Sequence, residues 1–170
     1  MSEDVIPSAG GRAAVLIAQR GDLFVYGTLR FPEVLRALLG RIPDSSPVTL
    51  DGWRAAALAR RTYPGLVPAN ATVPGMLFTG LRAEELEVLD EYESGPYDLR
   101  KLSLTDGRPA WSYVWTDATC VLPSDWSADE FAAEHLHGFV MQVGAWQAGR
   151  AAARSDRRIA FRPHDPEDVR

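Results

Sequence analysis

Two short stretches of the chain carry residue types that could do chemistry, and the first is LFVYGTLR, residues 23–30. Its apolar and aromatic start predicts a buried strand, which ends at Gly27 just before a helix pattern opens at Pro32. Such a strand–turn–helix exposes consecutive backbone N–H groups that can bind a carboxylate or phosphate. Glycine lets a ligand approach the backbone, and Thr28 adds a hydroxyl. The same arrangement is also a common plain connection, so the turn alone leaves both interpretations open.

The second stretch is LDEYESGPY, residues 89–97, at the expected end of a helix. Helical spacing places Glu93 beside Leu86 and Leu89, so its side chain leans toward the apolar face. The negative end of a helix dipole and an apolar neighbourhood both raise the pKa of a carboxyl group. A raised pKa suits a general acid/base working near neutral pH. Because Glu93 belongs to a run of acidic residues, a solvated helix-end acid is the alternative.

Other reactive residue types are poorly arranged for chemistry. The single cysteine, Cys120, excludes a disulfide framework within the chain, fits a reducing compartment and is expected to be a small core residue. His135 and His137 are two residues apart, so on a helix they point to different faces and lack the spacing of a zinc pair. Three tryptophans on predicted elements are expected in the core: Trp111, Trp115 and Trp146.

Strands and short helices must position these residues. The pattern predicts helices over 32–39, which ends before Gly40, and over 82–92, with Arg82 as a poor N-cap. Strands are predicted at 23–26, 48–58 and 73–78, the last bent or at a sheet edge because of Pro74 and Gly75. Tyr63–Ala69 is expected to be rich in turns.

The second half of the chain predicts a hairpin and a long helix. Strands over 99–104 and 110–115 flank the turn at Asp106-Gly107. Ser127 and Glu130 form a capping box that opens a helix. Its predicted apolar face consists of Leu136, Phe139, Val140, Val143 and Trp146. This mixed order predicts an α+β fold, either a small mixed β-barrel or a strongly curved sheet with flanking short helices.

Length and charge limit the organisation and the partners. The 170 residues suit one domain, predicted over 21–150, after a loose leader at 1–20 with a possible short strand and before a tail at 151–170. The net charge of −5 and the lack of a basic stripe argue against nucleic acid or an anionic membrane as partner. Neither a membrane-spanning apolar run nor a secretory signal is present, so we expect a cytoplasmic protein. The oligomeric state is left open.

Several motifs occur together in a recognisable order. VYGTLR at 25–30 is followed by YPGLVP at 63–68, VPGMLF at 73–78, LDEYES with Tyr97 and Arg100, AWSYVW at 110–115 and DWSADEFAAEHLHGFV at 125–140. In this order the chain resembles the γ-glutamylcyclotransferase-like superfamily, specifically its AIG2-like or γ-glutamylamine cyclotransferase-like branch. The resemblance covers residues 23–140 and implies the fold of that family.

The resemblance also implies roles for particular residues. In that family the YGTL turn binds the carboxylate end of the substrate through backbone amides, and a glutamate in the acidic stretch is the acid/base. Glu93 matches that glutamate, and Arg100 matches an arginine that either contacts substrate or braces the backbone through an ion pair. Arg30 has no implied role. The residues implied to bind substrate are Tyr26, Gly27, Thr28, Leu29, Tyr97, Pro64 and Gly65.

The implied reaction is intramolecular. The α-amino group of a small γ-glutamyl substrate attacks its own γ-amide, which closes 5-oxoproline and releases an amine, and no metal or cofactor is required. The sequence does not identify the amine. Two alternatives keep the fold: a non-catalytic module that binds a small molecule, and an amide hydrolase that uses water as the nucleophile.

Overall fold

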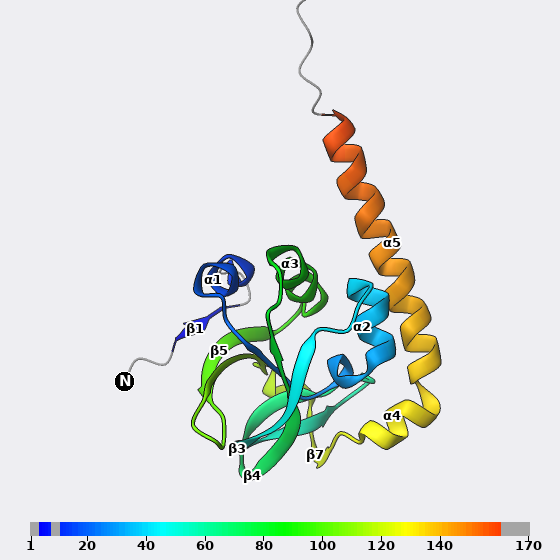
Figure 1. Ribbon diagram of the computed structural model, residues 1–170. Helices are drawn as coiled ribbons and strands as arrows, with labels where there is room; N and C mark the ends of the chain where they lie inside the picture. The colour runs from blue at the N-terminus through cyan, green and yellow to red at the C-terminus, as the bar shows by residue number, and fades with distance from the viewer. Residues whose placement is uncertain (1–3, 8–10, 161–170) are drawn as a thin grey trace, which may run out of the picture.

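The computed structural model describes residues 4–7 and 11–160 (Figure 1). Its strands are β1 (Val5–Ile6), β2 (Leu23–Val25), β3 (Asp44–Leu58), β4 (Gly65–Thr79), β5 (Tyr97–Ser103), β6 (Pro109–Trp115) and β7 (Val121–Asp125). Within the described residues they form one sheet in the order β1-β5-β6-β2-β4-β3-β7. Its neighbours are antiparallel, except that β6 runs parallel to β2 and β4. The sheet is curved and unclosed, which confirms the α+β fold in its curved-sheet form.

Helices and 3₁₀ turns flank this sheet. They are α1 (Arg12–Gln19), η1 (Thr28–Arg30), α2 (Pro32–Leu39), α3 (Ala83–Tyr92), η2 (Ala118–Cys120), α4 (Ala128–Glu134) and α5 (Leu136–Ala160). The helix prediction over 32–39 is confirmed, and Gly40 ends α2 with a φ of 72°. Figure 1 shows α5 passing beside α2 and extending beyond the rest of the molecule. None of the helices in the described ranges combines the length and apolarity that a bilayer crossing requires.

The strand β2 is buried on both faces of the sheet. Leu23 and Val25 belong to one apolar cluster, and Phe24 belongs to the other, because successive side chains of a strand alternate. Trp111 and Trp115 are buried, as predicted. Because β2 lies between β6 and β4, its end is held firmly, and the chain that follows it emerges at a fixed position.

The two longest strands, β3 and β4, form an antiparallel ribbon from Asp44↔Thr79 to Ala56↔Gly65. The strand predicted over 48–58 lies within β3, whose pairing with β4 shifts in register between Asp51 and Trp53. One prediction here is wrong: residues 65–69 belong to β4 and are not a turn-rich segment. For the strand predicted over 73–78, bent or at a sheet edge, the edge position is excluded because β4 pairs with both β2 and β3.

The hairpin prediction is confirmed by the pairing of β5 with β6 around Gly107, which has a φ of 87°. Ser127 also caps a helix, since its hydroxyl oxygen accepts a hydrogen bond from the N–H of Glu130. That helix, α4, ends at His135, and the chain continues as α5. The single long helix expected here is therefore two consecutive helices.

Both ends of the chain are more ordered than expected. The supposed leader contains β1 and the helix α1, where a short strand was predicted, and Arg12 and Leu16 of α1 are buried. The supposed tail continues α5 through residue 160, and the remainder, 161–170, lies outside the described residues. The first part of the leader, 1–3, and residues 8–10 lie outside them as well. The apolar side chains of α1 are buried on the body of the protein, which stabilises this helix where sequence pattern alone did not indicate one.

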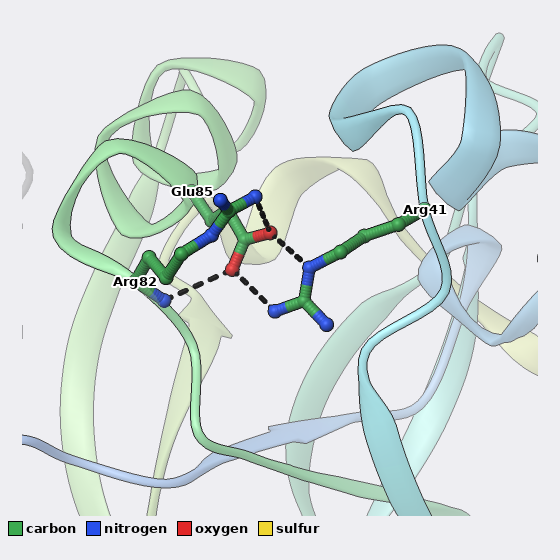
Figure 2. A network of polar contacts seen from close by, with 3 residues as sticks. All are labelled: Arg41, Arg82 and Glu85. Carbon is green, nitrogen blue, oxygen red and sulfur yellow. Dashed lines mark hydrogen bonds and ion pairs between the residues drawn. The ribbon is translucent and has the colours of Figure 1, made fainter.

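The start of α3 is fixed by a buried carboxylate, Glu85 (Figure 2). Arg82 precedes the helix, as predicted, and its backbone N–H donates to Glu85 Oε2 at 2.9 Å. Arg41 donates to both carboxylate oxygens, at 2.5 and 2.8 Å. Burial raises the pKa of Glu85, but the hydrogen bonds from Arg41 and Arg82 outweigh it and hold the pKa at about 2. Glu85 thus supplies the capping interactions that the N-cap residue, Arg82, provides poorly. It also anchors the start of α3, the helix that Glu93 follows.

Candidate active site

A cavity of about 310 Å³ opens beside the end of β2. Six parts of the chain line it: the end of β2 with the turn that follows, the loop before β4, the end of α3, the start of β5, one residue of β6, and one face of α5. The lining residues outside α5 are Phe24–Leu29, Tyr63, Pro64, Glu91–Ser94, Tyr97 and Tyr113. The cavity therefore brings together the two stretches that the sequence singled out.

The turn after β2 forms one wall. Tyr26, Gly27, Thr28 and Leu29 are all buried and all line the cavity. The first hydrogen bond of η1 runs from the N–H of Arg30 to the carbonyl of Gly27, at 3.1 Å. The N–H groups of Thr28 and Leu29 come before that bond, so the 3₁₀ turn itself gives them no partner.

Packing gives a reason for glycine at position 27 that the sequence pattern did not indicate. Its φ is −124°, so the turn does not use the left-handed backbone that favours glycine. A β-carbon at Gly27 would lie 2.7 Å from Pro64 Cγ, which is too close for any side chain. The glycine is therefore required for close packing of the turn against the loop before β4.

Pro64 and Tyr97 line the cavity as predicted, but Gly65 does not. The hydroxyl of Tyr97 donates to the carbonyl of Pro64 at 3.0 Å and so ties the loop to β5. At Gly65 a β-carbon would lie 2.7 Å from Trp115 Cβ. Gly65 thus lets β4 pack against a core tryptophan, and its predicted place in the lining is corrected.

Glu93 lies directly after the last residue of α3 and lines the cavity. Its backbone N–H bonds to the carbonyl of Leu89 at 3.0 Å, which closes the helix. The residue is half-buried and lines the cavity. Loss of solvation raises the pKa of Glu93 to about 7, although Arg12 lowers it and Asp90 adds a smaller increase. The carboxyl can therefore both accept and donate a proton near neutral pH.

Arg12 of α1 holds this end of α3 in place, a role that no local sequence pattern indicated. Its guanidinium donates to the backbone carbonyls of Tyr97 at 2.7 Å and of Asp90 and Glu93 at 3.1 Å. Its Nε lies 3.0 Å from Asp90 Oδ1. Three carbonyls and one carboxylate thus converge on one buried cation, which fixes the backbone of Glu93.

Tyrosines surround the carboxyl of Glu93, and their hydroxyl groups are occupied. Tyr26 donates to the carbonyl of Tyr113 and Tyr113 donates to Asp90 Oδ1, each at 2.7 Å. The hydroxyls of Tyr92 and Thr28 share a hydrogen bond of 2.7 Å, which links α3 to the turn. Burial, reinforced by the negative charge of Glu93 or Asp90, raises the pKa of Tyr26, Tyr92 and Tyr113 above the usual value. These tyrosines stay neutral and keep the cavity in shape.

The lining residues from α5 were not predicted as part of the site. They follow the helical spacing i, i+3, i+4, i+7 and consist of Phe139, Gln142, Val143 and Trp146. Trp146 was expected in the core, yet it is 39% exposed. A polar residue, Gln142, inside an otherwise apolar helical face was the available signal that this face meets a cavity.

Several other candidates lie away from the cavity lining. Arg30 and Arg100 do not line it, and the guanidinium of Arg100 lies 5.4 Å from the centre of the Trp53 ring. Cys120 is half-buried, with Sγ 3.2 Å from Asp117 Oδ2. His135 and His137 are exposed. In the described part of the chain no three His, Cys, Asp or Glu side chains are grouped as metal ligands.

Comparison with known proteins agrees with this geometry. The family described as gamma-glutamyl cyclotransferase, AIG2-like, matches residues 23–128, a range that includes the turn and Glu93 and stops before α5. AIG2-like protein C of Arabidopsis thaliana is 35% identical over 126 residues, which cover 70% of this chain and 73% of the relative. AIG2-like protein D of the same plant is 33% identical over 127 residues, or 70% and 84% of the two chains.

Solved structures extend the likeness to the fold. A solution structure of an Arabidopsis thaliana protein matches with a TM-score of 0.52 and 27% identity, over 72% of this chain and 87% of that one. A second has a TM-score of 0.54 and 22% identity over 88% and 95%, which shows a shared fold. The family match over most of the chain, together with relatives more than 30% identical, decides the family. The chain belongs to the AIG2-like gamma-glutamyl cyclotransferase family.

Proposed function

We propose that the protein is a γ-glutamylamine cyclotransferase that converts a γ-glutamyl amide to 5-oxoproline and a free amine, with Glu93 as general acid/base. One observation carries the proposal. Glu93 lines the same cavity as the turn Tyr26–Leu29, and the pKa of its carboxyl is about 7. Membership of the family supports the reaction class.

The substrate's α-carboxylate would bind at the turn. Among the described lining residues no lysine, arginine or histidine is present, so an anion there would bind through uncharged donors, among them backbone N–H groups. The N–H groups of Thr28 and Leu29 have no partner within η1 and can fill this role. Binding the carboxylate there would leave the rest of the γ-glutamyl chain to fold back within the cavity.

The chemical steps then need one proton carrier. The α-ammonium gives a proton to the carboxylate of Glu93, and the freed amine attacks the γ-carbonyl carbon. A C–N bond forms to close the five-membered ring, and the ring nitrogen then gives up a second proton. The C–N bond to the departing amine breaks, and both protons pass in turn through Glu93 to the departing nitrogen, which leaves as an ammonium ion. Because nucleophile and amide belong to one molecule, holding the chain folded supplies much of the rate acceleration. Backbone N–H groups near the turn are the candidate donors for the negative oxygen that forms on the carbonyl.

The test is the substitution Glu93→Gln. Glutamine keeps the size and hydrogen-bonding capacity of the side chain but cannot carry a proton at neutral pH. We expect purified parent protein to form 5-oxoproline from L-γ-glutamyl methylamide, measured by mass analysis of the products. We expect the variant to lose at least about a hundredfold in kcat/KM, the usual contribution of a general acid/base.

A matched control and the product identity make this test decisive. Glu84→Gln changes an exposed glutamate in the first turn of the same helix, and it should leave kcat/KM and the circular dichroism spectrum unchanged. Full activity of Glu93→Gln would falsify the mechanism. Glutamate as the product in place of 5-oxoproline would mean hydrolysis. Binding of the amide without turnover by the parent would mean a binding module.

A further inference from the structure

The cavity has a deep part and a rim, and different elements build them. The deep part is formed by the turn and by β5 and β6, where Thr28, Tyr97 and Tyr113 are at most 5% exposed. At the rim lie Trp146, which is 39% exposed, and Gln142, which is also exposed. Under the proposed function, the γ-glutamyl part occupies the deep part near Glu93, so the departing amine must lie toward the rim and α5.

The face of α5 that meets the amine is aromatic and apolar. Phe139 and Trp146 stand two turns apart, and the ring of Tyr92 packs edge-on against both, with ring centres 6.4 Å apart in each pair. Tyr92 is itself fixed by its hydrogen bond to Thr28. Aromatic rings placed this way offer edges and faces on which another ring can pack. The wall formed by Phe139, Val143 and Trp146 lies beyond residue 128, where the family match ends.

Charges at the rim argue against a second charged group, a carboxylate or an ammonium, on the departing amine. Apart from tyrosines, the described lining residues that ionise are Glu91 and Glu93. Two nitrogens of the Arg150 guanidinium already bind Glu91: Nη2 lies 2.9 Å from Oε1, and Nε bonds the other oxygen. A carboxylate on the departing amine would meet Glu93 and no cationic lining residue, and an ammonium would find Glu91 already paired.

We propose that the leaving group of the substrate is an amine that carries an aromatic ring and no charged substituent, and that its ring packs against the wall that Phe139 and Trp146 form on α5. This inference rests on the proposed cyclotransferase function and narrows its substrate class. Three features select this amine together: the aromatic wall, the 39% exposure of Trp146, and the lack of a cation among the described lining residues.

Four synthetic amides separate ring, size and charge. They are the L-γ-glutamyl derivatives of 2-phenylethylamine, L-phenylalanine, L-phenylalaninamide and methylamine. The phenylalanine and phenylalaninamide compounds differ only in whether the terminal carboxyl is ionised. The readout is kcat/KM for 5-oxoproline formation by the intact protein at one pH and salt concentration.

We expect the phenylethylamine compound to react with a kcat/KM about tenfold or more above the methylamine compound, since burial of an added ring favours binding in the transition state. The phenylalaninamide compound should be close to the phenylethylamine compound, whereas the phenylalanine compound should fall about tenfold or more below phenylalaninamide. Equal values for the charged and uncharged pair would overturn the proposal.

The variant Trp146→Ala tests the wall itself. The ratio of kcat/KM for the phenylethylamine compound to that for the methylamine compound should fall about three- to tenfold, the range for one lost aromatic contact. Met141→Ala is the control, because Met141 is on the same helix, 65% exposed and outside the cavity lining, so it should leave the ratio unchanged. Circular dichroism verifies that both variants are folded.

Failure of this inference differs from failure of the proposed function. If none of the four amides yields 5-oxoproline, the cyclotransferase proposal fails. A second outcome is that all four amides yield 5-oxoproline while kcat/KM for the phenylethylamine compound is near that for the methylamine compound. A third is that Trp146→Ala leaves the ratio of these two values unchanged. In either case only the assignment of the leaving group fails. A methylamine compound that reacts faster than the aromatic compounds has the same meaning.

Discussion

At the scale of single residues, Glu93 gains its chemistry from its position at the end of α3. Burial raises the pKa of its carboxyl group to about 7, and Arg12 keeps that pKa from rising further. Arg12 contacts the backbone of Glu93 and forms an ion pair with Asp90, so we describe it as a positioning residue. The charge of Arg12 lowers the pKa of Glu93, and its hydrogen bonds fix the position of the Glu93 backbone.

These two roles of Arg12 can be separated by pH profiles. In the parent protein kcat/KM should rise as pH rises through about 7, because Glu93 must be ionised to take the ammonium proton. Arg12→Gln removes the cation that lowers the pKa of Glu93, so the midpoint of this rise should move to higher pH. The variant should also unfold more easily, by about 3 kcal/mol or more, because the carboxylate of Asp90 loses its partner.

Arg12→Lys is the matched comparison, since it keeps the charge and loses the forked hydrogen bonds. It should lower the free energy of unfolding while leaving the midpoint of the pH profile near the parent value. Identical midpoints in the glutamine and lysine variants would contradict a role of Arg12 in setting the pKa of Glu93.

At the scale of elements, the turn after β2 depends on tight packing against the loop before β4. Gly27→Ala would place a β-carbon 2.7 Å from Pro64 Cγ and push the turn and loop apart. Since small displacements of binding groups are costly in catalysis, kcat/KM should fall about tenfold to a hundredfold. Gly138→Ala in α5, where an added β-carbon meets nothing within 4 Å, should leave kcat/KM unchanged. Equal activity of the two variants would show that the turn tolerates displacement.

Local sequence signals identified the elements that carry the turn and Glu93. The helix over 32–39, the hairpin of β5 and β6 and the capping serine of α4 were all predictable, because their turns and caps depend on nearby residues. The first part of β4 was missed because its prolines and glycines indicate turns. Pairing with β3 keeps residues 65–69 extended, and such long-range pairing is not visible in local sequence.

The site was only partly predictable for the same reason. The turn, Pro64, Tyr97 and Glu93 line the cavity as expected, while Gly65 does not. Arg12 and the α5 wall reach the cavity across the fold, so no local pattern linked them to Glu93. Their contacts depend on how α1 and α5 pack, which becomes known only with the structure.

At the scale of the whole molecule, the proposed catalytic carboxyl of Glu93 lowers the free energy of unfolding when it is ionised. The pKa of Glu93 is about 7 in the folded protein, against 4.5 for an ordinary glutamate. Between those values the folded chain keeps a proton that the unfolded chain has lost, so the free energy of unfolding falls as pH rises through this range. This loss is fully present above about pH 7.

Glu93→Gln should therefore stabilise the protein while it removes activity. At about pH 8 the free energy of unfolding should exceed that of the parent by about 1–3 kcal/mol, measured by urea denaturation. The difference should shrink when the same measurement is made at about pH 5.5, where Glu93 is protonated in the folded state. A gain that is the same at both pH values would show that the charge of Glu93 is not its source.

The wide separation of the lining residues along the chain has a consequence for how the protein is made. The cavity takes residues from Phe24 to Trp146, and Arg12 bonds partners 78 to 85 positions later. Contacts that join distant parts of a chain form late, because they close large loops. During synthesis, the turn after β2 leaves the ribosome long before α5 exists to cover it. We therefore expect the cavity of a nascent chain to stay open and inactive until α5 has left the ribosome.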